Sequence, residues 1–109
     1  MKKVIPKSCI SQSDTNYFIY CQVPGVKKEN LDINLSDEIL HIHARPTYDI
    51  KEDMKALNTE FSITKVFERH FILGNRVDKE SINAKIEEGI LEVSLAKSKE
   101  ILGKKIEIQ

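Results

Sequence analysis

The chain has 109 residues, enough for one domain with a buried core and too few for two. Its 17 basic residues balance 17 acidic ones, so no net electric field would steer it to nucleic acid or to anionic lipid. It has no apolar run near the ~20 residues of a membrane span, and the run at its start is too short for a signal peptide, so we expect a cytoplasmic protein whose zero net charge favours self-association.

The first predicted strands lie in the first quarter of the chain. One begins near Cys9, and aromatic and β-branched residues predict another over residues 17–23. The second strand ends at Pro24-Gly25, a pair suited to the two central positions of a type II turn. A charged link over residues 27–30 leads to the next strand.

The next segment alternates between apolar and polar side chains. Leu, Ile and Leu take alternate positions over residues 31–35, and Leu, Ile and Ala do so over residues 40–44, with a short break at 36–38. This pattern predicts a β-hairpin with one apolar face. His41 and His43 fall on the opposite face.

A long connection precedes the second half of the domain. It covers residues 46–62, and a structureless loop of about that length is uncommon in a compact domain unless it has a role. Residues 59–63 could form an additional strand within it. An alternating segment over 67–73 predicts the strand that follows.

The final hairpin has the clearest local pattern. Apolar residues alternate over 82–86 and again over 91–95, and Gly89 sits between them, where a three-residue connection requires a positive φ. A short apolar pair follows at 106–108. At least six such strands, without a useful helical period, predict an all-β fold, an immunoglobulin-like antiparallel β-sandwich.

Five segments, spread over most of the chain, carry a resemblance to a known family. They are VPGVKKENL at 23–31, LHIHA at 40–44, FERHFIL at 67–73, AKIEEGIL at 84–91 and IEI at 106–108. In this order they resemble the small heat-shock proteins, the α-crystallin domain family. The resemblance implies a short arm over residues 1–8, an α-crystallin domain over 9–97 and a tail with an Ile-x-Ile motif over 98–109.

The resemblance also implies a docking groove between two strands. Its walls would be Leu31, Ile33, Leu35, Ile82, Ala84 and Ile86. In the family, the two tail isoleucines, here Ile106 and Ile108, fill this groove on a neighbouring subunit. The alternative for Ile106 and Ile108 is an ordinary last strand, packed on its own domain or frayed.

Arg69 lies between two phenylalanines on one strand face, and a buried arginine needs a partner. It matches the arginine at the family's dimer interface, where Glu60 of the other subunit is a candidate partner. The alternative is an edge-strand arginine whose guanidinium reaches water. The long segment between Ala44 and Phe67 is similar to that of bacterial and plant members, in which an extra strand swaps into the partner's sheet.

No catalytic, cofactor-binding or metal site is expected. The sequence has no phosphate-binding glycine loop, nucleophile motif or placed acid–base pair, which argues against an enzyme. His41 and His43 share a strand face, but two ligands do not make a site, and His70 and Cys21 lie elsewhere in the sequence. Cys9 and Cys21 lack the spacing of a zinc or redox site and are read as reduced thiols.

By resemblance, the function is that of an ATP-independent chaperone, a holdase that binds partly unfolded client proteins through apolar grooves and edge strands. Its other partners would be itself, as a dimer or larger oligomer, and other small heat-shock proteins. The short arm departs from the family and puts a large oligomer in doubt. Two alternatives therefore stay open: a short assembly partner of longer small heat-shock proteins, or a co-chaperone or scaffold with one dedicated partner.

Overall fold

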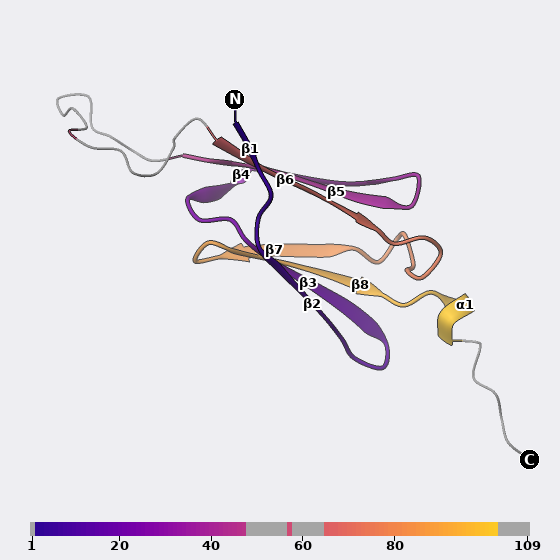
Figure 1. The fold of residues 1–109 in the computed structure, drawn as a ribbon. Coiled ribbons are helices and arrows are strands. Elements are labelled where there is room, and N and C mark those ends of the chain that lie inside the picture. The colour runs from indigo at the N-terminus through magenta and orange to yellow at the C-terminus, as the bar shows by residue number, and fades with distance from the viewer. Residues whose placement is uncertain (1, 48–56, 58–64, 103–109) are drawn as a thin grey trace, which may run out of the picture.

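The computed structural model describes residues 2–47, 57 and 65–102, and it shows two packed layers of β-strands (Figure 1). The elements are β1 (Lys2–Val4), β2 (Ser8–Gln12), β3 (Asn16–Gln22), β4 (Val26–Ser36), β5 (Ile39–Pro46), β6 (Lys65–Ile72), β7 (Asn83–Glu87), β8 (Ile90–Ala96) and the single-turn helix α1 (Lys99–Leu102).

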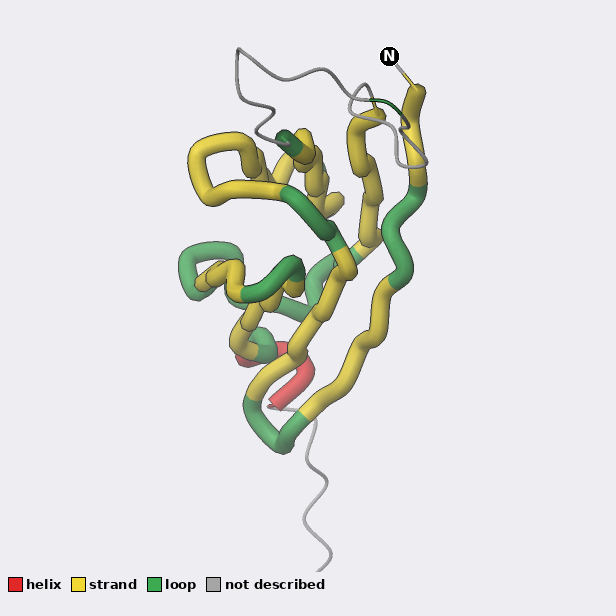
Figure 2. The backbone as a smooth tube through the Cα atoms, turned by 90° about the vertical axis from the view of Figure 1, so that its left-hand side faces the viewer, coloured by secondary structure: helices red, strands yellow, loops and turns green. Residues whose placement is uncertain are grey.

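Within the described part of the chain, each layer is a four-stranded sheet. One sheet has the order β1-β6-β5-β4 and the other has the order β2-β3-β8-β7. The strand pairs formed by the described residues are antiparallel except β1 with β6, which run parallel. The chain passes from β1 into β2 along one side of the molecule and turns back as β3 (Figure 2). The predicted all-β sandwich is confirmed.

The core lies between the four inner strands β3, β8, β5 and β6. Alternate residues of each strand point inward, as the period of two requires: Ile19 lies opposite Val93, and both are almost completely buried. Burying one such side chain is worth about 1.5 to 3 kcal/mol. The core side chains are Ile19, Cys21, Val23, Val26, Leu40, Ile42, Ala44, Phe67, Phe71, Val77, Leu91, Val93 and Leu95.

The predicted turn at Pro24-Gly25 is confirmed. Gly25 has a φ of 79°, and the Val26 N–H donates to the Val23 carbonyl at 3.2 Å, as in a type II turn. Beyond it, the predicted charged link over 27–30 belongs to β4, which carries an irregularity between Val26 and Leu31. A bulge of this kind lets charged residues continue a strand whose inward face is apolar.

Two hairpins close through two-residue loops. Ser36 pairs with Ile39, so the loop between β4 and β5 is Asp37-Glu38, and both residues have a positive φ. This geometry matches a type I′ turn, whose twist suits the flanking strands.

The β7–β8 hairpin corrects one expectation. Glu87 pairs with Ile90, so the predicted three-residue connection is wrong and the loop is Glu88-Gly89. The positive φ predicted for Gly89 is confirmed at 76°, and Glu88 shares it at 49°. The Gly89 carbonyl accepts a hydrogen bond from the Val23 N–H at 2.8 Å, which connects this turn to the turn at Pro24-Gly25.

Two elements were not anticipated from the pattern. Residues 2–4 of the predicted arm form β1, and α1 begins the predicted tail. Most of the 46–62 connection, the candidate strand at 59–63 and the Ile-x-Ile motif at 106–108 lie outside the described residues.

Candidate interaction surface

Strands β4 and β7 form one open side of the sandwich. Each is the last strand of its sheet, so one side of its backbone has no strand partner within the described part of the chain. The opposite edges, β1 and β2, are joined by the three-residue link 5–7 and therefore lie together. Consequently β4 and β7 share the other side of the molecule.

The predicted groove residues of β4 face the interior. Leu31, Ile33 and Leu35 lie opposite the buried residues of β5 and pack against the core, yet each remains partly exposed. Inward-facing apolar side chains on a strand would be fully covered if another strand followed. Their partial exposure is the consequence of the missing neighbour.

The predicted residues of β7 show the same arrangement. Ile86 lies opposite Leu91 and Ala84 lies opposite Val93, so both face inward. Ile82 and Ile86 pack partly buried against the core, whereas the small Ala84 is exposed. The strand register thus brings the predicted residues to two neighbouring edges, and their use as a docking groove stays a prediction.

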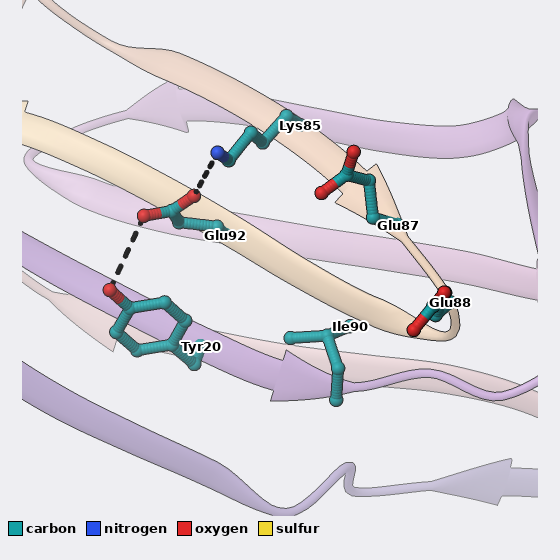
Figure 3. Close-up of a pocket in the computed structure, with 6 residues that line it drawn as sticks. All are labelled: Tyr20, Lys85, Glu87, Glu88, Ile90 and Glu92. Atoms are coloured by element: carbon teal, nitrogen blue, oxygen red, sulfur yellow. Dashed lines mark hydrogen bonds and ion pairs between the residues drawn. The ribbon is translucent and has the colours of Figure 1, made fainter.

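The outward face of the β7–β8 hairpin is polar by contrast. The Tyr20 hydroxyl donates to Glu92 Oε1 at 3.3 Å, and Lys85 Nζ lies 3.0 Å from Glu92 Oε2; the two interactions are the dashed lines in Figure 3. Loss of solvation and then the Glu92 carboxylate raise the pKa of Tyr20, and the hydrogen bond that Lys85 donates to the Glu92 carboxylate raises the pKa of Lys85. Tyr20 and Lys85 are both paired with Glu92 on this face, which also carries Glu87, Glu88 and the exposed Ile90.

A second, smaller apolar surface was missed from the sequence. Ile10 of β2 lies opposite the buried Ile19, yet it is 57% exposed because β2 is an edge strand. With Phe71 and Val77 it lines a pocket of about 150 Å³, beside which Ile72 is 81% exposed. The signal in the sequence is weak, because β2 contains a single large apolar residue.

Arg69 points into the interior, as its position between two inward-facing phenylalanines predicted. Its Nη1 donates to the Pro6 carbonyl at 3.0 Å, and its guanidinium carbon lies 5.1 Å from the centre of the Phe71 ring. Burial raises the pKa of the Cys21 thiol, and the positive charge of Arg69 partly offsets that rise. The predicted partner Glu60 lies outside the described residues, so the dimer role of Arg69 stays a prediction.

The histidines lie on the outward face of β5 and β6. His41 pairs with His70 across the strands, and their ring centres are 4.5 Å apart. His43 Nε2 lies 3.8 Å from Glu68 Oε1. Among the described residues, no three His, Cys, Asp or Glu side chains form a metal-binding group, and no helix is long and apolar enough to cross a membrane.

Sequence comparison identifies the family. Residues 9–109 match the profile of the Hsp20/alpha crystallin family. The chain belongs to this family. Its members, the small heat-shock proteins, are ATP-independent chaperones and not enzymes.

Individual relatives agree with this assignment. Small heat shock protein C2 of Rickettsia felis is 29% identical over 108 residues, which are 99% of this chain and 70% of the relative. Heat shock protein HSP.16.4 of Streptococcus thermophilus is 32% identical over 100 residues, 89% of this chain and 69% of the relative.

Solved structures share the fold. HSP18.5 from E. histolytica aligns with a TM-score of 0.74 at 23% identity, over 100% of this chain and 97% of that one. Heat shock protein 16.0 from Schizosaccharomyces pombe aligns with a TM-score of 0.72 at 24% identity, over 97% and 99% of the two chains. The α-crystallin sandwich predicted for this protein is therefore confirmed.

Proposed function

We propose that this small heat-shock protein is a holdase that captures partly unfolded proteins at the open side formed by β4 and β7. The observation that carries the proposal is the pair of neighbouring edge strands whose inward apolar residues stay partly exposed. An extended client segment can add to a free strand edge through backbone hydrogen bonds, while its apolar side chains cover the exposed ones. Such capture needs no ATP, because it uses only surface that the folded domain already presents.

The same surface would accept the tail of a neighbouring subunit. Burying Ile106 and Ile108 would contribute about 1.5 to 3 kcal/mol each, against about 1 to 2 kcal/mol of backbone entropy per ordered residue. A single tail therefore binds weakly and exchanges, whereas several tails in one assembly gain from high effective concentration. Exchange would expose the edge to clients in turn.

Dimerisation forms the second part of the proposal. Arg69 and Glu60 of the partner subunit would meet at the dimer interface, with a strand from the 46–62 segment exchanged between subunits. The protein would act in the cytoplasm on unfolding clients, alone or together with other small heat-shock proteins.

A second candidate function is that of an assembly partner with little client binding of its own. The observation in its favour is β1, because residues 2–4 of the arm are paired with β6. Arm residues held in a sheet are not available for clients.

One experiment separates the two candidates. A thermolabile client enzyme is heated with and without the protein, and its aggregation is followed by light scattering while the complex is sized. We expect protection by the wild type, loss of protection in Ile33→Lys, and retention in Asn34→Lys, a matched control on the outward face of the same strand. Absence of protection by the wild type at several-fold molar excess would exclude the holdase, and equal protection by Ile33→Lys would exclude this surface.

A further inference from the structure

The outward face of the β1-β6-β5-β4 sheet brings together histidines that are far apart in the sequence. His41 of β5 lies between Asn34 of β4 and His70 of β6 in one cross-strand row. Across the strands, directly opposite side chains have their Cβ atoms about 4.5 to 5.5 Å apart. The backbone therefore holds the two imidazoles as neighbours, and neither depends on a loop for its position.

The two rings are already in contact. Their centres are 4.5 Å apart with an interplanar angle of 66°, His70 is exposed and His41 is partly exposed, so solvent reaches the pair. A Zn²⁺ ion binds imidazole nitrogens at about 2.0 to 2.1 Å, which in tetrahedral geometry places two such nitrogens roughly 3.3 Å apart. To bind one ion, both side chains would rotate on their strands until a nitrogen of each ring reaches this spacing.

We propose that His41 and His70, whose rings are in contact, supply two imidazole ligands to a borderline divalent cation such as Zn²⁺ or Ni²⁺, and that water molecules supply the further ligands that two histidines alone do not. Neutral imidazole is the common protein ligand for these ions. The site goes beyond chaperone action, and it lies on the face of the sheet opposite to the core and to the inward apolar residues of β4.

Charged neighbours set the local field at this site. Glu68 and Asp32 lie in the adjacent cross-strand row, on either side of His43, and their carboxylates favour a bound cation. Lys3 Nζ lies 3.3 Å from Glu68 Oε2 and opposes it, as does the exposed Arg45 further along β5. Protons compete with the metal for the same nitrogen lone pairs, so the affinity falls as the pH is lowered.

Metal binding at this pair would join β5 to β6. The folded sheet holds the two rings together and the unfolded chain does not, so the ion binds the native state preferentially and stabilises it. The site would therefore raise the melting temperature without touching the apolar edge that is proposed to bind clients.

The test is a calorimetric titration of the tag-free, metal-free chain with ZnCl₂ and with NiCl₂. Cys9→Ser serves as the parent, because the exposed Cys9 thiol is an independent zinc ligand. We expect one ion per chain and a higher melting temperature. His41→Gln and His70→Gln should each weaken binding by about tenfold or more, while His43→Gln, a third histidine on the same face, should leave the affinity unchanged.

An NMR titration reads the same site without substituting any histidine. Zinc should shift the imidazole proton resonances of His41 and His70 and leave those of His43 nearly unmoved. The proposal is overturned if the parent shows no saturable binding, if His41→Gln and His70→Gln bind as tightly as the parent, or if His43→Gln weakens binding as much as they do.

Discussion

The two open sides of the sandwich differ in a way that matters for binding. On the β4–β7 side, partly exposed Leu and Ile side chains occupy every second position of β4 over residues 31–35, and Ile82 and Ile86 flank the exposed Ala84 along and just before β7. The opposite side, called the β2–β6 side, is bordered by β2 and by the part of β6 that β1 does not cover. There Arg69 donates to the Pro6 carbonyl, and the apolar surface is limited to one small pocket. An extended polypeptide fits a continuous row at a free edge, whereas a pocket of this size accepts a single side chain.

The first prediction tests whether the apolar residues of β4 contribute less to the stability of the fold than the buried residues of β5 do. Ile42→Ala removes a buried side chain beside the edge and should lower the free energy of unfolding by about 2 to 5 kcal/mol. Ile33→Ala, directly opposite on β4, should cost less because its side chain is only partly buried. Urea denaturation gives both values. Equal losses would mean that Ile33 is an ordinary core residue.

The second prediction concerns the capped side. Arg69→Ala leaves the carbonyl of the buried Pro6 without its donor, and an unsatisfied buried group costs about 1 to 3 kcal/mol. Arg69→Lys keeps the charge without the planar guanidinium and should fall in between. Urea denaturation gives the free energy of unfolding of both variants. Light scattering gives the size of the dimer, which we expect to be less stable in Arg69→Ala. A dimer of unchanged size would remove Arg69 from the interface.

The third prediction tests the turn that holds β7 in place. Gly89→Ala places a side chain at a positive φ and brings its Cβ to about 3.3 Å from the Cα of Pro24, so it should cost about 1 to 2 kcal/mol. Gly74→Ala is the matched control: its φ is also positive at 61°, but the nearest atom lies at 4.0 Å. If Gly74→Ala lowers the melting temperature less than Gly89→Ala does, the difference is due to the contact of residue 89 with Pro24 in the neighbouring turn.

The fourth prediction sets the smaller apolar surface against the larger one. Ile72→Ser replaces a side chain that is 81% exposed, so its effect on the free energy of unfolding should stay within about 0.5 kcal/mol. Client protection in the heating assay should equal that of the wild type. Loss of protection in this variant would move the client site to the β2–β6 side and would break the distinction drawn between the two sides.

The last prediction uses the two thiols as reporters of an edge and of the interior. Cys9 on the β2 edge is exposed and should react with a thiol reagent in the native protein, whereas buried Cys21 should react only on unfolding. Because burial raises the folded-state pKa of Cys21, its contribution to stability is complete below the unfolded pKa of about 8.5 and falls as the pH rises toward the folded value. Urea midpoints from pH 7.5 to 9.5 should decline more for the wild type than for Cys21→Ala.

The sequence alone was enough for the described strands other than β1 and the first residues of β4, and for most of their turns. A period of two is a local property, so alternation at 31–35, 40–44 and 91–95 indicated both the strand and its inward face, and the glycines at 25 and 89 marked turns that need a positive φ. The sequence predicted a three-residue connection before Ile90, one residue longer than the loop Glu88-Gly89. Loop length depends on which residues pair, and alternation leaves that choice open.

Pairing across the two sheets was decided by the tertiary structure. The sequence shows that Ile33 and Ile86 face inward, but only the strand order shows that their strands are edges and therefore leave them partly exposed. In the same way, His70 lies beside His41 because β6 pairs with β5. Arg69 of β6 reaches the Pro6 carbonyl because the link between β1 and β2 passes next to β6. Local patterns determine which face a side chain occupies, and long-range packing determines what lies next to it.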